Sequence, residues 1–179
     1  MPDLDGRERQ VSYFAAAVVR TPDGWTGREL DLDDVEDIDG VSDQLRDALA
    51  DGDGPALMFL EENDEYFLVV RVESSDSDEA RSFISDVRSV ETSELAAKLY
   101  EAAADPVVDD EDGEDDDEES SARPEGEPGG DEAILADLGT KAADLHGLCT
   151  EEGMLPADVI YALCERAGCA DVLEDLRGA

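Results

Sequence analysis

Four side chains that could bind a metal or react as nucleophiles lie close together near the C-terminal end of the chain. The stretch "HGLCTEEGMLPADVIYALCERAGC", residues 146–169, contains the only histidine and all three cysteines. His146 and Cys149 are three residues apart on one predicted helix, and Cys164 and Cys169 are five apart near the end of the next, so a helix hairpin could gather four ligands around zinc. The placement is poor for such a site, because Cys169 falls beyond a helix-ending glycine and outside the helix that carries Cys164.

The same residues also fit the interior of packed helices, because free cysteine behaves as a small buried hydrophobe. Cys149 and Cys164 each belong to an apolar stripe at helical spacing, whereas His146 lies at the edge of its stripe and is expected at the surface or at a boundary. Core packing is therefore the favoured interpretation, and zinc binding and a reactive thiol are the alternatives. The stripes are Leu135, Leu138, Ala142, Leu145 and Cys149, and Val159, Ile160, Leu163, Cys164 and Ala167.

Other catalytic motifs do not occur in the sequence. It has no G-x-S-x-G nucleophile elbow, no glycine-rich phosphate loop ending in Gly-Lys-Ser and no His-Glu-x-x-His helix. With 51 acidic side chains, any pair of carboxylates is a weak candidate for acid–base catalysis. We therefore predict no catalytic, cofactor-binding or metal-binding residues, and a protein that is not an enzyme. Trp25 is expected to pack half-buried on a sheet, and it is also the best candidate for a binding hot spot.

The first part of the chain predicts an α+β domain over residues 1–104. Three continuous apolar runs are typical of strands buried on both faces, and two more segments predict shorter strands. Together with two amphipathic helical patterns they indicate a mostly antiparallel five-stranded sheet with two helices. The strands are expected at 11–20, 25–30, 56–60, 66–72 and 81–87, and the helices at 41–49 and 93–100.

A very acidic segment separates this domain from the rest of the chain. Residues 105–131 contain 14 acidic residues, one basic residue and almost nothing to bury. Because such a segment cannot offset the entropy of ordering, we expect a disordered, extended linker that could also serve as an acidic arm for a basic partner. The helical period beyond it predicts a small four-helix bundle over residues 132–179, with Pro156 opening one helix.

The net charge of −38 limits the classes of partner. Such a charge repels the phosphates of nucleic acids and anionic membranes. The N-terminus lacks the pattern of a signal peptide, and no apolar run is long enough to cross a bilayer. An odd number of cysteines indicates reduced thiols rather than a disulfide framework. We therefore expect a cytoplasmic protein that binds neither nucleic acid nor membrane directly.

The predicted sheet has more apolar surface than its own two helices can cover. Three strands are apolar on both faces, and two helices cover about one face of a five-stranded sheet. The C-terminal bundle, a second copy or a partner could cover the other face. We favour a homo-oligomer or a partner interface on the N-terminal domain, because repulsion within the acidic linker opposes tight intramolecular docking.

Several stretches together carry a family resemblance. They are "YFAAAVVRTPDGWTGRELDLDDVEDI", "ALMFLEENDEYFLVVRV", "FISDVRS", the long acidic segment, and "ILADLGTKAADLHGLCTEEGMLPADVIYALCERAGCADVLEDL". In these stretches the chain resembles the tRNA adenosine deaminase-associated proteins of actinobacteria. The resemblance implies association with the deaminase that converts adenosine to inosine at the wobble position of a tRNA anticodon. The chain does not carry the deaminase's own signature, H-x-E with P-C-x-x-C around a zinc-activated water, because His146 is followed by Gly147 and Leu148, and Cys164 is preceded by Leu163.

The leading hypothesis is a non-catalytic accessory or adaptor protein whose acidic surface contacts a basic, tRNA-binding partner, for which the deaminase is the candidate. One alternative is an enzyme of unknown type that uses its carboxylates or thiols. Another is that the acidity is an adaptation to a high-salt habitat, which the excess of arginine over lysine also fits.

Overall fold

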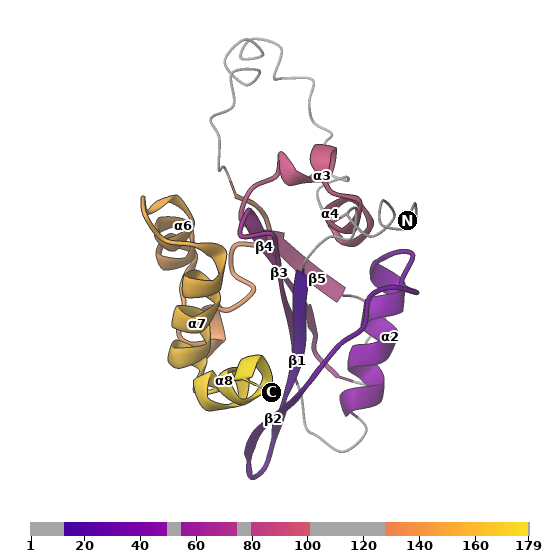
Figure 1. Ribbon diagram of the computed structural model, residues 1–179. Helices are drawn as coiled ribbons and strands as arrows, with labels where there is room; N and C mark the ends of the chain where they lie inside the picture. Colours follow the sequence, from indigo (N-terminus) through magenta and orange to yellow (C-terminus); the bar gives the residue numbers. More distant parts are fainter. Residues whose placement is uncertain (1–12, 50–54, 75–79, 101–127, 179) are drawn as a thin grey trace, which may run out of the picture.

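An antiparallel sheet with helices on both sides forms the molecule (Figure 1). The computed structural model describes residues 13–49, 55–74, 80–100 and 128–178. The strand order is β2-β1-β3-β4-β5-β6, and every neighbouring pair is antiparallel. The α+β class with an antiparallel sheet is therefore confirmed. The strands are β1 (Tyr13–Thr21), β2 (Gly24–Glu29), β3 (Ala56–Glu62), β4 (Tyr66–Val72), β5 (Ala80–Ile84) and β6 (Gly129–Gly130).

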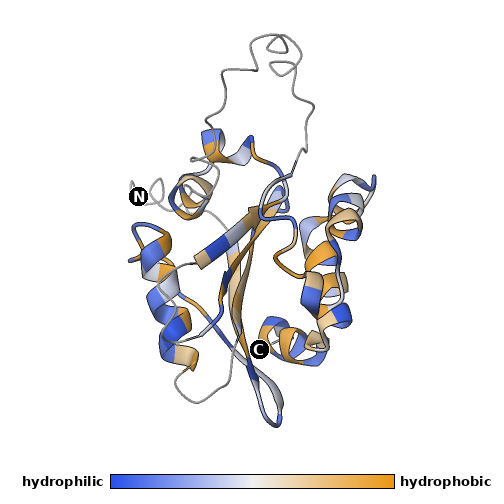
Figure 2. Ribbon diagram, turned by 180° about the vertical axis from the view of Figure 1, so that it is seen from behind, coloured by the Kyte–Doolittle hydropathy of each residue, from blue (hydrophilic) through white to orange (hydrophobic). Residues whose placement is uncertain are grey.

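The central strands β1, β3 and β4 are apolar on both faces because each face contributes to a separate core. Successive side chains of a strand point to opposite faces. In β4, Leu68 and Val70 belong to one buried cluster, and Phe67 and Val69 belong to the other. Figure 2 shows the central strands coloured as hydrophobic, with helices of mixed colour on either side. The continuous apolar runs of the sequence are thus explained by burial on both faces.

The prediction of five strands was wrong, because residues Gly129–Gly130 add a sixth at the sheet edge. This short strand, β6, pairs with Phe83 and Ile84 of β5. A Cβ atom at Gly129 would lie 2.4 Å from Val87 Cγ1 and 2.6 Å from the Tyr100 hydroxyl. The approach is closer than real Cβ contacts allow, so glycine fits where a larger residue would not. A strand made of two glycines has no side-chain alternation by which the sequence could reveal it.

Helices α2 (Ile38–Ala48), α3 (Ser89–Thr92) and α4 (Glu94–Leu99) lie on the sheet face that carries Leu68 and Val70. The sequence predicted two of them and missed α3, which is a single turn. Asp37 caps α2 by accepting from the Gly40 amide, and Ser93 caps α4 by accepting from the Ala96 amide. Side-chain oxygens at these positions stabilise a helix start, where the first amides have no carbonyl partner within the helix.

The C-terminal segment forms a layer on the other face of the sheet rather than a bundle of four α-helices. It contains a short 3-10 helix, η4 (Ala136–Leu138), and the helices α6 (Ala142–Thr150), α7 (Pro156–Ala167) and α8 (Ala170–Gly178). Pro156 begins α7, and Gly168 ends it with a left-handed φ of 95°. Both positions agree with the prediction, since proline is tolerated in a first helical turn and glycine readily adopts positive φ.

The chain itself therefore covers the sheet face that we expected a partner or a second copy to cover. Phe59, Phe67 and Phe83 of the sheet share one buried cluster with Leu145 of α6 and Leu163 of α7. The expectation of an uncovered face was wrong, because burial of apolar area between the sheet and the C-terminal helices stabilises docking more than repulsion within the linker opposes it. A homo-oligomer formed through the N-terminal domain stays a prediction.

Arg71 of β4 connects the sheet to the C-terminal segment. Its side chain is 4% exposed and donates from Nη1 to the carbonyl oxygen of Ile134 at 2.7 Å. The guanidinium also binds both carboxylate oxygens of Asp137, at 2.7 and 2.9 Å. Hydrogen bonding to Asp137 raises the pKa of Arg71, and the same contact lowers the pKa of Asp137.

Most of the predicted acidic linker, residues 105–127, lies outside the described residues. Its last four residues do not fit the prediction of disorder, because they include a buried Pro128 and the strand β6. Asp131 also forms an ion pair of 2.7 Å with Arg81. The division into domains at 104 and 131 stays a prediction. Within the described ranges, none of the helices has the length and apolar character needed to span a membrane.

Candidate functional site

The histidine and the cysteines of residues 146–169 are divided between surface and core. His146 is exposed on α6 and Cys149 is half-buried, whereas Cys164 and Cys169 are buried in the cluster between the sheet and the helices. Burial raises the pKa of the Cys149 thiol to about 12. A hydrogen bond with Cys169, together with burial, raises the pKa of Cys164. In the part of the chain that the structure describes, no group of three or more His, Cys, Asp or Glu side chains is placed to hold a metal ion.

Trp25 lies at the start of β2 and is half-buried against the end of α7. Its indole Nε1 donates to the carbonyl oxygen of Ala167 at 3.2 Å, and its ring packs against the C-terminal layer. The Arg20 guanidinium lies 5.8 Å from the ring centroid. Packing on a sheet was the predicted role, and the structure confirms it.

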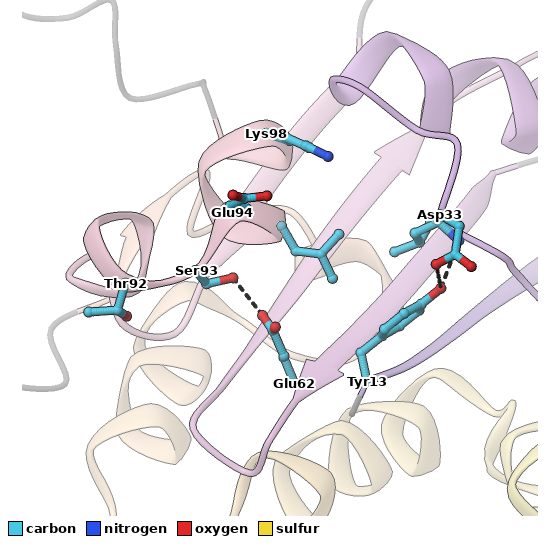
Figure 3. A pocket seen from close by; sticks show the side chains of 9 residues that line it. Tyr13, Asp33, Glu62, Thr92, Ser93, Glu94 and Lys98 are labelled. Carbon is cyan, nitrogen blue, oxygen red and sulfur yellow. Dashed lines mark hydrogen bonds between the residues drawn. The ribbon is translucent and has the colours of Figure 1, made fainter. Parts of the chain in front are cut away.

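A pocket of about 600 Å³ opens on the sheet face that carries α4 (Figure 3). It lies between the start of β1, the segment after β2, the end of β3, and α3 with α4. Its volume is in the range of ligand-binding clefts. The lining residues are Tyr13, Leu32, Asp33, Glu62, Thr92, Ser93, Glu94, Leu95 and Lys98.

Glu62 is the most deeply buried charged residue of this pocket. It is 4% exposed at the end of β3, and its Oε1 accepts from the Tyr66 hydroxyl at 2.7 Å and from the Ser93 hydroxyl at 2.5 Å. Among the described residues, no group donates to its Oε2 and no basic side chain forms an ion pair with it. Figure 3 shows the carboxylate directed into the space between α4 and Tyr13.

Local sequence explains why a carboxylate is held there. β3 and β4 are joined by a tight turn in which Asn63 and Asp64 have positive φ of 53° and 62°, which asparagine and aspartate tolerate better than most residues. The turn places Tyr66 beside Glu62 on one face. Ser93 links α4 to Glu62, since its hydroxyl accepts from the Ala96 amide at the start of α4 and donates to the Glu62 carboxylate.

Tyr13 and Asp33 form the opposite wall of the pocket. The Tyr13 hydroxyl accepts from the Leu32 amide at 2.9 Å and lies 3.5 Å from Asp33 Oδ1. Burial raises the pKa of Tyr13 above its ordinary value. Lys98 also lines the pocket, but its Nζ contacts the Val35 carbonyl oxygen at 3.4 Å. The ammonium group of Lys98 is thus bound to a backbone carbonyl oxygen rather than to the Glu62 carboxylate.

Two further hollows share lining residues with this pocket. One, of about 450 Å³, shares Tyr13 and Asp33, and the other, of about 400 Å³, shares Thr92. We call the three together the acidic groove, because acidic side chains in it outnumber basic ones. Its acidic residues are Glu29, Asp31, Asp33, Glu62, Glu65, Asp86, Glu91 and Glu94, and its basic residues are Arg88 and Lys98.

The charge of the acidic groove favours the approach of positively charged groups. Its carboxylates could not be selected from sequence because acidic residues occur throughout the chain. The signal that could have found Glu62 is its place beside Glu61 at the end of a strand that begins with five apolar residues, four residues before a tyrosine. The strand was expected to end at residue 60, so Glu62 fell between two predicted strands and was given no role.

One protein family matches almost the whole of the described structure. The model of the family described as "Rv3753c-like tRNA adenosine deaminase-associated protein" matches residues 13–170, from the first residue of β1 to the first residue of α8. The match therefore includes the sheet, the helices on one face, and the C-terminal layer up to the start of α8. No curated protein and no solved structure matches the chain.

Proposed function

Because the chain belongs to the family of Rv3753c-like tRNA adenosine deaminase-associated proteins, we propose that it is a non-catalytic accessory protein of a tRNA adenosine deaminase. The family match over residues 13–170 is the observation that carries the proposal. Since tRNA is modified where it is made and used, the proposal also places the protein in the cytoplasm.

The contact with the deaminase is proposed to be electrostatic. A protein that binds tRNA needs a basic surface to neutralise phosphates, and a chain with a net charge of −38 complements such a surface. Complementary charge speeds association and favours the correct partner over others. The same acidic surface can compete with tRNA for the deaminase, so the accessory protein either assists assembly or regulates access to RNA.

A non-catalytic role agrees with how the reactive groups are used. The pKa of the Cys149 thiol, about 12, leaves little thiolate near neutral pH, and thiolate is the reactive form of cysteine. Glu62 and Arg71 are engaged in contacts between structural elements. We assign these groups no chemical step.

Affinity purification of the tagged full chain from the cell that makes it tests the proposal. At about 50 mM salt the deaminase should be recovered with the chain, and treatment with RNase should leave the recovery unchanged or increase it. A deaminase signal that RNase abolishes would show that RNA bridges the two proteins. Absence of the deaminase at low salt would refute a physical association and leave only a genetic one.

A further inference from the structure

We propose that the pocket around Glu62 receives an arginine side chain of a protein partner. The inference rests on the proposed function insofar as the partner there is a basic, tRNA-binding protein. The pocket would be the anchor point within the acidic groove, and the rest of the groove would accept neighbouring residues of the same partner segment.

The Glu62 carboxylate has one oxygen without a donor among the described residues. A buried carboxylate is costly unless its oxygens are hydrogen-bonded or paired with a cation. Glu62 is 4% exposed, and both of its hydrogen bonds, from Tyr66 and Ser93, go to the same oxygen, Oε1. Oε2 faces the pocket without a donor from the described residues. A cation entering the pocket would supply the donor and the compensating charge together.

The walls of the pocket carry carboxylates and an aromatic ring, which suit a guanidinium. Glu94 stands across the pocket from Asp33, and the Tyr13 ring lies between Asp33 and Glu62 (Figure 3). A guanidinium presents five donors in a planar fork, can bind carboxylates on more than one side, and stacks on aromatic rings. An ammonium is more strongly hydrated and lacks the planar fork, so arginine fits these walls better than lysine.

The extent of the acidic groove favours a protein segment over a free small cation. The hollows on both sides of the pocket continue the acidic lining, toward Glu29 and Asp31 at one end and toward Asp86 and Glu91 at the other. An occupant that extends beyond a single side chain can use all three hollows. A basic peptide segment has that form, and the groove's excess of carboxylates complements it.

The test uses N-acetylargininamide as probe and N-acetylcitrullinamide as its uncharged match. The isotopically labelled full chain is titrated with each probe and followed by nuclear magnetic resonance of backbone amides. Arginine should produce saturable shifts at Leu32, Glu62 and Ser93, and citrulline at the same concentration should produce none. Equal effects of the two probes would overturn the proposal, because recognition would not depend on the cation.

Three variants locate the binding. Glu62→Gln keeps an acceptor for Tyr66 and Ser93 but removes the charge, and should weaken arginine binding about tenfold or more. Glu94→Gln changes an exposed residue of the pocket wall and should weaken binding by a smaller factor. Because Glu94 is exposed, this variant should stay folded and tests the pocket even if Glu62→Gln misfolds. The matched control is Glu165→Gln, an exposed carboxylate of α7 on the opposite side of the sheet, which should leave binding unchanged.

Two outcomes would overturn the assignment. Shifts scattered over the whole acidic surface and equal in all three variants would show counterion binding without a site. Saturation of the pocket by spermidine but not by N-acetylargininamide would show that the occupant is a free polyamine.

These probes do not involve the deaminase. A pocket that fails to bind arginine leaves the recovery of the deaminase with the chain intact. Binding of arginine without recovery of the deaminase would instead refute the proposed partner and leave the pocket in place.

Discussion

Replacing Arg71 by methionine tests whether the sheet and the C-terminal layer form one cooperative unit. The guanidinium is 4% exposed and donates to the Ile134 carbonyl oxygen and to both oxygens of Asp137. It also contacts the half-exposed carboxylate of Glu73, which like Asp137 returns to water when the guanidinium is removed. Methionine fills much of the same space but donates nothing. The buried carbonyl then loses its partner, which costs about 1–3 kcal/mol. Asp137 is 61% exposed, so its carboxylate returns to water and adds less than about 1 kcal/mol.

We therefore expect Arg71→Met to lower the free energy of unfolding by about 2 kcal/mol. Urea unfolding of the full chain, followed by far-ultraviolet circular dichroism and by fluorescence of the single tryptophan, measures it. Trp25 contacts the end of α7, so its fluorescence reports whether the C-terminal layer stays docked. In the unmutated chain the two signals should give the same midpoint, because the helices and the sheet share a buried cluster.

The matched control is Arg166→Met, which removes the same charge from a partly exposed ion pair with Asp144, 3.5 Å long. It should change stability by less than about 0.5 kcal/mol. Equal losses in the two variants would refute the role of Arg71, because only the change in net charge would then matter.

The pH dependence gives an independent check on Arg71. Arg71 lowers the pKa of Asp137 in the folded protein. The stability from this contact is present above the unfolded pKa of aspartate, about 3.9, and is lost as the pH falls through the lower folded pKa. The difference between the unmutated chain and Arg71→Met should therefore shrink in acid. A difference that stays constant down to about pH 2 would contradict the assignment.

Three further predictions follow from the packing, the thiols and the charge. Gly27→Ala places a Cβ atom 2.6 Å from Val172 Cγ1 and 2.8 Å from a backbone carbonyl oxygen, and should destabilise the chain by about 1–3 kcal/mol in urea unfolding. Gly147→Ala in helix α6, where a Cβ atom would have nothing within 4 Å, should be neutral or stabilising. A larger loss of stability for Gly147→Ala than for Gly27→Ala would contradict the close contact at Gly27. Cys149→Ala and Cys164→Ala should each lower the free energy of unfolding by on the order of 1 kcal/mol, with no change in metal content by elemental analysis. Because burial raises the pKa of Cys149 to about 12, the stability that this buried thiol contributes is present below the unfolded pKa of about 8.5 and is lost as the pH rises toward 12. Stoichiometric zinc that either variant loses would contradict core packing. Sodium chloride from about 20 mM to 500 mM should raise the thermal midpoint by screening repulsion among the acidic residues while the chain stays folded throughout, whereas loss of structure at low salt would favour adaptation to a salty habitat.

The sequence predicted the elements that carry a strong local pattern. β4 was expected at 66–72, where the structure has it, because an apolar run bounded by turn residues has few other interpretations. Pro156 and Gly168 marked the ends of α7 correctly, since both act through the backbone.

The features that the sequence left hidden depend on contacts between distant residues. Nothing local to β4 or to α7 indicates that the helices cover the sheet, because apolar stripes fit a separate bundle equally well. Gly129 could not be recognised as part of a strand without the crowding by Val87 and Tyr100. Glu62 becomes distinctive only when Ser93, 31 residues away, is placed beside it.

Titration of the purified full chain with the purified tRNA adenosine deaminase, in the absence of RNA, measures the proposed contact directly. Isothermal titration calorimetry at about 50 mM and about 500 mM salt should show saturable binding that weakens as salt rises, because the contact is proposed to be electrostatic. An undetectable interaction at low salt, with both proteins folded and at concentrations up to about 0.1 mM, would contradict the proposal that this protein acts on the deaminase by direct contact.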